Sequence, residues 1–336
     1  MCLNSRGFDV KIAVLFTELD DHSSVDDQDV LAQVEAVSQS IRELGFLPEA
    51  TPISLDLKSA FARFKEFRPD FVFNLVESLG GVGRFPHFVP TILDFLNIPY
   101  SGGSSFCIYQ TTDKVLTKKL LLQAGIKTPG WWSPKMSAGP PFPPPYIIKP
   151  AWEDASVGID AGSVINEAGL LQESLQRRMN RYGECFVEAF IPGREFNISM
   201  LASAEEPEVL PPAEMLFINF PQGKPEIVDY AAKWDESSFE FVNTVRTFKF
   251  SERDAPLLAQ LEEISRRCWH LFECRGYVRV DFRVDRVGQP WVLEVNVNPC
   301  ISPDSGFVAA LNSAGYSYTQ MVERILRASG LNVNKQ

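Results

Sequence analysis

The strongest constraint on the fold lies in residues 276–299, GYVRVDFRVDRVGQPWVLEVNVNP, where apolar and polar side chains alternate on either side of a turn signal. Alternate side chains of a β-strand point to opposite faces, so each half of the stretch predicts a strand with one apolar face. The DRVGQP between them is typical of a hairpin turn. A turn centred on Val287 and Gly288 gives the polar face two opposed pairs: Asp281 with Glu294, and Arg279 with Asn296.

The opposed carboxylates predict a cation site. Directly opposed Cβ atoms lie about 4.5–5.5 Å apart, and two carboxylates at that distance repel unless a cation lies between them. A solvated strand face of mixed charge is the alternative, but the apolar runs on both sides indicate burial. Mg²⁺ takes one or two carboxylates and shares its remaining positions with water and phosphate. The same alternation places Val292 on the polar face and Leu293 on the apolar face.

Composition limits the class of protein. The chain has 336 residues, 45% hydrophobic and 22% charged, which is a globular composition with room for two or three domains. The net charge of −11 argues against a nucleic-acid or anionic-membrane partner. The six cysteines form no CxxC motif and there are only three histidines, so free thiols are expected and a zinc site is not. The absence of a long apolar run or a signal peptide predicts a cytoplasmic protein.

The order of elements predicts an α/β fold. Strand and helix patterns alternate up to about residue 105, which indicates a parallel sheet with crossover helices. One of these helices, over residues 29–44, is expected to begin with Asp29 as N-cap and to stop at Gly45. From about residue 185 the chain is mainly β, apart from a helix near residues 254–273.

Three lysines indicate a site for phosphate. Lys149 ends an apolar strand, Lys114 follows the expected helix cap Thr112, and Lys233 lies between a strand and a loop. Each lysine alone is more often a solvated surface residue, but Lys149 interrupts a strand that reads as buried. The loop EDASVG, residues 153–158, offers small residues whose N–H groups could cap a phosphate. It matches neither a GxGxxG nor a Walker A motif.

Together these motifs resemble the ATP-grasp superfamily, and most closely the D-alanine–D-alanine ligase family. The resemblance covers nearly the whole chain and is carried by LNIPYSGGS, TDKVLTKKLL, IIKP, SVGI, VEAFIPGREFNI, VDYAAKW, VRVDFRVD and LEVNVNPCISPDS. It implies an ATP-grasp fold with three domains: an N-terminal parallel α/β domain (1–108), a central α+β lid domain (109–188) and a C-terminal α+β domain (189–336). Members of the family are commonly homodimers.

The resemblance also implies a nucleotide site. Three lysines would hold the phosphates of ATP: Lys114, Lys149 and Lys233. Ser156 lies in the loop that would close over them. Glu188 and the segment up to Ile191 would line the adenine slot, largely through backbone groups, and Glu195 would take the ribose hydroxyls.

The metal and catalytic groups follow from the same resemblance. Two Mg²⁺ ions, with Mn²⁺ as the alternative, would be bound by Asp281, Glu294 and Asn296. Arg279 would stabilise the tetrahedral intermediate, and Ser305 would contact the carboxylate of the second amino acid. Cys300 stands where the family has an oxyanion-binding glycine, and its thiol is expected to be inert. Phosphoryl transfer to a carboxylate followed by amine attack needs these metal, cation and oxyanion-stabilising groups.

The chain departs from the family at the acyl donor. The family usually holds the ammonium of the first D-alanine with a glutamate in the first loop, braced by a serine and a tyrosine. Ala155 and Trp234 stand at the positions of the serine and the tyrosine. The first loop, residues 17–29, has carboxylates at other spacings: Glu18, Asp20, Asp21, Asp26 and Asp27. We therefore predict an ATP-dependent carboxylate–amine ligase with altered acyl-donor specificity, acting on small molecules.

Other functions stay open at this point. The chain could be a genuine D-alanine–D-alanine ligase of cell-wall synthesis that holds the same ammonium with a different aspartate. It could also be a catalytically inactive ATP-binding regulatory protein, although buried charges without a use destabilise a fold and are expected to be lost first. A kinase that phosphorylates without ligating would be separated from a ligase by its product.

Overall fold

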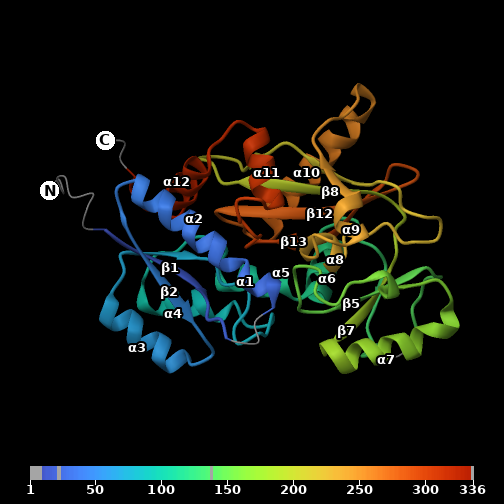
Figure 1. Ribbon diagram of the computed structural model, residues 1–336, viewed down its shortest axis with the longest axis horizontal. Coiled ribbons are helices and arrows are strands. Elements are labelled where there is room, and N and C mark those ends of the chain that lie inside the picture. Colours follow the sequence, from blue (N-terminus) through green and yellow to red (C-terminus); the bar gives the residue numbers. More distant parts are fainter. Residues whose placement is uncertain (1–9, 21–23, 137–138, 334–336) are drawn as a thin grey trace.

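The computed structural model describes residues 10–20, 24–136 and 139–333. Cys2, Asp21 and His22 lie outside the described residues. Figure 1 shows three groups of strands: one that contains β1 and β2, one that contains β5 and β7, and a large one that contains β8, β12 and β13. The mixed α/β architecture predicted from the sequence is confirmed. In the described part of the chain, no helix has the length and apolar character that crossing a membrane requires.

The first sheet is parallel, as the alternation of elements predicted. Its order is β2-β1-β3, and β1 pairs in parallel with both neighbours. The strands are β1 (Lys11–Thr17), β2 (Leu47–Ile53) and β3 (Phe71–Asn74). The helices between and after them are α1 (Val25–Gln28), α2 (Val30–Glu43), α3 (Leu57–Phe67) and α4 (Phe88–Leu96). Gly45 follows α2 with φ +83°, as expected for a residue that ends a helix.

The second sheet is small and antiparallel. Its order is β4-β7-β5-β6, and α7 packs on β5 and β7. Its elements are β4 (Trp131–Trp132), β5 (Tyr146–Pro150), β6 (Val164–Ile165), α7 (Leu171–Tyr182) and β7 (Cys185–Ala189). We call this unit the lid sheet.

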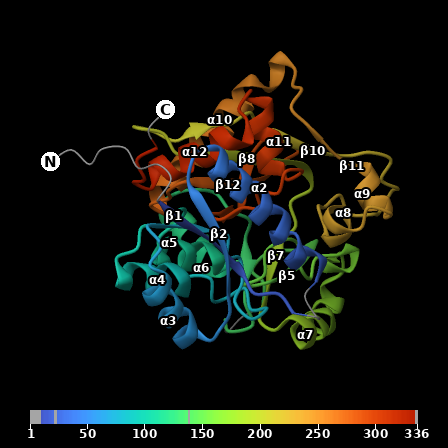
Figure 2. The same cartoon turned by 60° about the vertical axis from the view of Figure 1, so that its left-hand side comes forward.

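The third sheet is antiparallel and runs through the centre of the molecule. Its order is β11-β10-β8-β12-β13, with β9 also paired to β8. The strands are β8 (Gly193–Leu201), β9 (Glu208–Val209), β10 (Ala213–Phe217), β11 (Thr244–Thr247), β12 (Tyr277–Asp285) and β13 (Pro290–Asn296). The accompanying helices are α8 (Tyr230–Trp234), α9 (Phe239–Asn243), α10 (Ala255–Leu271), α11 (Gly306–Ser313) and α12 (Tyr318–Ala328). Figure 2 shows α8 and α9 set apart from the other helices of this group, beside β5 and β7.

Two further helices connect the first sheet to the lid sheet: α5 (Ser105–Thr112) and α6 (Lys114–Gln123). The cap of α6 is Asp113, whose carboxylate accepts from two backbone N–H groups, so the prediction of Thr112 as cap is wrong. Thr112 instead ends α5. Leu121 of α6 packs in one core with β8, β12 and β13, whereas α11 and α12 share a core with β1 and α2. The domain boundaries after residues 108 and 188 stay a prediction.

The hairpin of β12 and β13 pairs as predicted but contains a bulge. Arg279 faces Asn296 and Asp281 faces Glu294, after which the register shifts and Phe282 faces Val292. Leu293 is the extra residue, so it lines a cavity while Val292 is buried in the core. The prediction of the faces of Val292 and Leu293 is therefore wrong. The cause is the turn, which is one residue tighter than a symmetric turn on Val287 and Gly288, and the bulge restores the register.

Candidate active site

All thirteen residues predicted for the site line one cavity of about 530 Å³. They come from α6, β5, the loop after β5, β7, β8, α8, β12, β13 and the segment before α11. These are Lys114, Lys149, Ser156, Glu188, Ile191, Glu195, Lys233, Arg279, Asp281, Glu294, Asn296, Cys300 and Ser305. The fold thus brings together residues that lie up to about 190 positions apart in the sequence.

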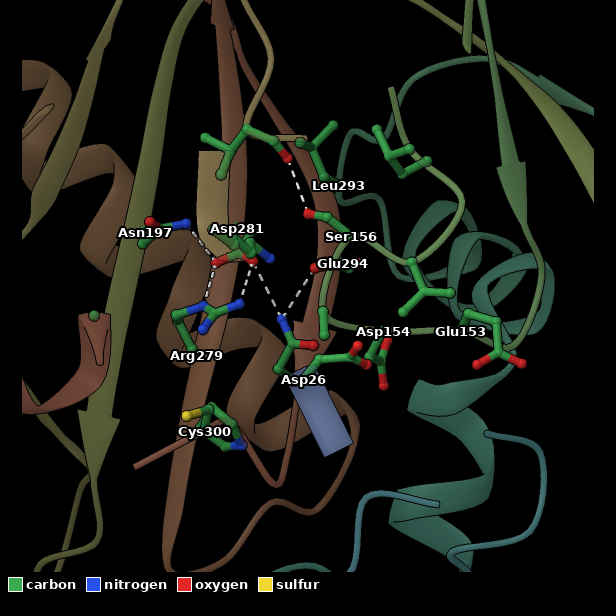
Figure 3. A pocket seen from close by; sticks show the side chains of 18 of the residues that line it. Asp26, Glu153, Asp154, Ser156, Asn197, Arg279, Asp281, Leu293, Glu294 and Cys300 are labelled. Carbon is green, nitrogen blue, oxygen red and sulfur yellow. Dashed lines mark hydrogen bonds and ion pairs between the residues drawn. The ribbon is translucent and has the colours of Figure 1, made fainter. Parts of the chain in front are cut away.

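Asp281 is the centre of the polar face of the hairpin (Figure 3). Its carboxylate accepts from Arg279 through Nε at 2.8 Å and Nη2 at 2.9 Å, and from Asn197 Nδ2 at 2.7 Å. Asn296 Nδ2 donates to Asp281 at 3.2 Å and to Glu294 at 3.3 Å. One amide N–H₂ group therefore bridges the two carboxylates that the sequence predicted to lie opposite each other.

The two carboxylates differ in their electrostatics. Burial raises the pKa of Asp281, and the charge of Arg279 opposes that shift. Burial also acts to raise the pKa of Glu294, but the charges of four cations outweigh it and hold this pKa well below its usual range. These cations are Lys114, Lys233, Lys149 and Arg279. Glu294 is accordingly a carboxylate at neutral pH.

The donor set fits a divalent cation that phosphate helps to bind. Among the described residues, no group of three or more His, Cys, Asp or Glu side chains is arranged to hold a metal ion. Asp281 and Glu294 supply two carboxylates, and turning the amide of Asn296 would present its oxygen in place of the bridging nitrogen. The protein thus supplies only part of a coordination shell, as expected for Mg²⁺ at a nucleotide site.

The lysines are held by carboxylates that line the same cavity. Lys114 Nζ contacts Asp154 Oδ1 at 2.6 Å and donates to the carbonyl of Glu153 at 2.6 Å. Burial acts to lower the pKa of Lys114, but Asp154 and Glu294 outweigh it and the pKa is raised. Lys149 Nζ donates to Glu188 Oε1 at 2.7 Å.

A second buried lysine, Lys118, shares Glu188 with Lys149. It forms an ion pair with Glu188 Oε2 and donates to Thr128 Oγ1 at 2.8 Å, and its side chain is only 1% exposed. Burial lowers the pKa of Lys118 despite this partner. For Glu188, burial is outweighed by Lys118 and Lys149, which lower its pKa. The result is a buried lysine–carboxylate–lysine triad.

Glu188 lies in the cavity differently from the prediction. Its backbone is in the middle strand of the lid sheet, opposite Ile147 on one side and Trp131 on the other. Its side chain, not its backbone, faces the lysines. Ile191 follows the end of β7 and also lines the cavity. The adenine role of the segment stays a prediction.

Glu195 is buried on β8, and Lys233 is partly buried on α8. Glu195 Oε2 lies 3.2 Å from Arg283 Nε, and burial raises the pKa of Glu195 although Arg283 opposes the shift. Burial lowers the pKa of Lys233, and the nearby charge of Arg279 lowers it further. The ammonium of Lys233 is therefore disfavoured until an anion binds.

The loop after β5 is hydrogen-bonded to α8 and to the segment before it. Ala155 and Ser156 have left-handed φ angles of 53° and 62°, a conformation that is uncommon for residues with a side chain. Ser156 Oγ donates to the carbonyl of Val228 at 2.9 Å, and Trp234 Nε1 donates to the carbonyl of Ala155 at 3.0 Å. Gly158 completes the loop, because an added Cβ would lie 2.8 Å from Pro150.

The other end of the cavity is lined by further carboxylates: Asp26, Asp29 and Glu77. Tyr230 donates its hydroxyl to Asp26 at 2.8 Å. Burial raises the pKa of Glu77 to about 7, against the effect of its hydrogen bond from Gln33. Asp29 is the N-cap residue of α2, as predicted, but its side chain makes no cap hydrogen bond; the carboxylate instead accepts from Ser302 and Gln33.

Cys300 and Ser305 lie near this end. Cys300 Sγ is 3.1 Å from Asp29 Oδ2, and burial raises the pKa of the thiol, with Glu77 and Asp29 adding to the shift. A protonated thiol agrees with the expectation that it is inert. Ser305 is the N-cap of α11 and accepts from the backbone N–H of Val308. The cysteines in the described ranges are all free thiols, as expected.

The family model described as "D-ala D-ala ligase C-terminus" matches residues 140–327, which is more than half of the chain. The chain belongs to the D-alanine–D-alanine ligase family. The matched segment contains the lid sheet except β4, the large sheet, and every predicted site residue except Lys114. As a member of this family the protein is a D-alanine–D-alanine ligase-like, ATP-dependent enzyme that acts on small molecules.

Several relatives are similar along most of their length. The protein is 33% identical to the uncharacterized protein y4sG of Sinorhizobium fredii over 76% of this chain and 73% of that protein. It is 27% identical to a D-alanine–D-alanine ligase of Synechococcus sp. (strain JA-2-3B'a(2-13)), over 87% of this chain and 86% of the relative. It is 28% identical to the D-alanine–D-alanine ligase of Moorella thermoacetica, over 82% of this chain and 87% of that relative.

Solved structures show the same fold. The D-alanine–D-alanine ligase of Bacillus anthracis complexed with ATP superposes with a TM-score of 0.70 at 21% identity, covering 95% of this chain and 97% of that one. The D-alanine–D-alanine ligase of Coxiella burnetii superposes with a TM-score of 0.68 at 16% identity. The match covers 96% of this chain and 94% of that one. The predicted ATP-grasp fold is thereby confirmed.

Several residues in or beside the cavity were missed by sequence reasoning. Arg283 lies on the polar face of β12 with Arg279, so the alternation that found Arg279 contained it. Lys118 lies one helical turn after Lys114, and an acidic residue in a buried strand, Glu188, was the available signal for its partner. Arg246 and Glu77 gave no signal, because each stands in a segment that reads as a surface strand end or a loop.

Proposed function

We propose that the protein forms an amide bond between a carboxylic acid and an amino acid, through an acyl phosphate, and that D-alanine is not its acyl donor. The observation that carries the donor part is the bond from Trp234 Nε1 to the carbonyl of Ala155. This bond uses the one polar atom of the Trp234 side chain to hold the loop after β5 in place. Neither residue is then able to brace a carboxylate that holds a donor ammonium.

The nucleotide part of the proposal rests on the cations around the cavity. Lys114, Lys149 and Lys233 would bind the phosphates, with the backbone N–H groups near Ser156 closing over them. Asp281, Glu294 and Asn296 would hold two Mg²⁺ ions, which when bound supply neutralisation of phosphate charge. Neutralising cations around a transferring phosphoryl group are the main requirement of this reaction.

The catalytic part rests on Arg279. Its Nε and Nη2 are held by Asp281, which fixes the plane of the guanidinium, while Nη1 is not part of that pairing. A fixed cation stabilises a developing oxyanion without reorganisation. Desolvation acts to lower the pKa of Arg279, but Asp281 and Glu294 outweigh it and raise the pKa, so the group stays charged. Ser305 and the backbone N–H of Cys300 would lie at the acceptor side of this centre.

One observation favours the second candidate, a genuine D-alanine–D-alanine ligase. Asp26 comes from the first loop and is held by a tyrosine hydroxyl, that of Tyr230, one helical turn before Trp234. This pair could replace the braced glutamate of the family. Against it, two other carboxylates, Asp29 and Glu77, line the same end of the cavity, where one ammonium needs only one. A donor with more positive charge or a different shape fits that lining better.

A single assay separates the two candidates. The purified protein is incubated with ATP, Mg²⁺ and D-alanine alone, and then with pairs of other acids and amino acids, while ADP release and product mass are measured. We expect ADP release and an amide product with a pair that lacks D-alanine as donor. Turnover of D-alanine to D-alanyl-D-alanine at about 1 s⁻¹ or faster would contradict the proposal and establish the second candidate. A phosphorylated product without an amide would indicate a kinase.

A further inference from the structure

Strand β11 presents to the cavity two polar side chains that each have one buried atom without a hydrogen-bond partner. Thr244 and Arg246 lie two positions apart and both line the cavity, while Val245 between them is 41% exposed on the opposite face. Thr244 Oγ1 and Arg246 Nε are buried without a partner. In the described part of the chain, Glu188 Oε2 is the only other buried side-chain atom without a hydrogen-bond partner, and the ammonium of Lys118 neutralises its charge in an ion pair.

The surroundings of Arg246 disfavour a cation. Its guanidinium lies against Gly306, the first residue of α11, since a Cβ added to Gly306 would be 3.2 Å from Nη2. A helix N-terminus repels positive charge. Burial lowers the pKa of Arg246 and the charge of Arg279 lowers it further, while the exposed Asp304 opposes the shift. Within the described residues, Arg246 makes no ion pair.

A half-buried guanidinium with a buried, unpaired Nε in such a place is explained by an anion that binds there. Leaving a buried polar group unpaired costs about 1–3 kcal/mol, and more for a charged group. An anion between Arg246, Arg279 and the N-terminus of α11 would remove this cost and would be favoured by all three groups. Such an anion would also accept a hydrogen bond from Thr244 Oγ1.

We infer that the amino acid that acts as acceptor carries a second acidic group, and that Arg246 and Thr244 bind it. Ser305 would hold its α-carboxylate, as the resemblance to the family implies, so this inference rests on the proposed function. Arg279 is held by Asp281 through Nε and Nη2 and serves the oxyanion, whereas the guanidinium fork of Arg246 is free to match a further carboxylate bidentately. The second guanidinium therefore makes acidic amino acids the substrate class, with Arg246 as the residue that determines specificity.

Calorimetry with the full-length protein tests this without knowledge of the donor. The protein is saturated with MgADP, and glutamate, aspartate and their amides glutamine and asparagine are titrated in both chiral forms. We expect at least one acidic amino acid to bind about tenfold more tightly than its amide. Arg246→Gln should abolish this preference and leave MgADP affinity unchanged. Arg253→Gln, which removes an exposed arginine outside the cavity, should keep the preference.

Each other outcome overturns a defined part of the argument. If amides bind as tightly as acids while MgADP binds, the acidic acceptor is wrong and the proposed ligase function stands. If Arg246→Gln weakens acids and amides equally, Arg246 serves the α-carboxylate and the inference is again wrong. If MgADP itself fails to bind, the proposed function fails and the inference falls with it. The preference of the unmodified protein decides the question even if the variant does not fold.

Discussion

The two ends of the cavity differ in how their charges are matched. At the nucleotide end, Lys114, Lys118 and Lys149 each contact a carboxylate within the protein. At the amino-acid end, the half-buried Arg246 has a buried Nε without a hydrogen-bond partner, and the half-buried Glu77 has only an amide donor. These three lysines are balanced before any ligand binds, whereas Lys233 and the amino-acid end have groups that only a ligand would balance.

The difference shows where this chain keeps the pattern of its family and where it departs. The balanced charges stand at the positions whose motifs carried the resemblance. The unbalanced ones at the amino-acid end, Arg246 and Glu77, stand outside those motifs. A nucleotide is the same for every member of such a family, but the amino-acid end has to fit a particular pair of substrates.

The largest expected effect tests the balanced end. Lys118→Met removes one arm of the buried triad and leaves Glu188 with Lys149 alone. Breaking a buried ion pair in this way costs about 3–5 kcal/mol, and urea denaturation should show that loss in the free energy of unfolding. Lys119→Met, at the exposed next position of the same helix, should cost less than about 1 kcal/mol. If Lys118→Met and Lys119→Met lower the free energy of unfolding equally, the charges at the nucleotide end are not balanced by the buried triad.

The pH dependence of the free energy of unfolding tests the amino-acid end of the cavity. The pKa of Glu77 is raised to about 7 in the folded protein, above its value in the unfolded chain. Its stabilising contribution is therefore complete at pH 4 and is lost as the pH rises through 7. Relative to Glu77→Gln, the free energy of unfolding should fall by about 2–3 kcal/mol between pH 4 and pH 8.

The exposed Glu66 provides the control for this titration. Glu66→Gln removes a carboxylate from the surface of α3 and should change the free energy of unfolding equally at both pH values. If the unmodified protein and Glu77→Gln show parallel pH profiles, Glu77 is not buried as a carboxyl group, and the amino-acid end is better balanced than the structure indicates.

Nucleotide affinity gives a smaller effect. Lys149→Ala removes one cation from the expected phosphate site, and Glu188 keeps Lys118 as its partner, so the fold should survive. We expect the affinity for MgATP to fall about 10–100-fold, while the affinity for adenosine stays unchanged. Calorimetry with both ligands measures this, and equal ATP affinity of variant and parent would remove Lys149 from the phosphate site.

The smallest effect sharpens the contrast with Lys118. Arg246→Met replaces a half-buried guanidinium, whose buried Nε has no partner, with an apolar chain. Because nothing in the protein is left unpaired, the free energy of unfolding should change by less than about 1 kcal/mol or rise. Urea denaturation beside Lys118→Met is the measurement. A loss as large as that of Lys118→Met would mean that Arg246 has a structural role and not one in binding.

Sequence patterns predicted the site best where local geometry determines position. Period-two alternation placed Arg279, Asp281, Glu294 and Asn296 on one face, and the pairing of the hairpin confirmed both opposed pairs. It failed at Val292 and Leu293, because a bulge depends on how the turn closes and not on alternation. The parallel first sheet followed from the order of strands and helices for the same local reason.

The partners of the charged residues were decided only by the tertiary structure. Glu188 and Lys118 are 70 positions apart in the sequence, and nothing local indicates that α6 packs against the lid sheet so that they meet. Arg246 stands in a short edge strand that, by pattern alone, is an ordinary surface segment. Alternation is a property of the covalent backbone and is written in neighbouring residues. Burial and charge pairing depend on which distant elements pack together, and that is why they had to be seen in the fold.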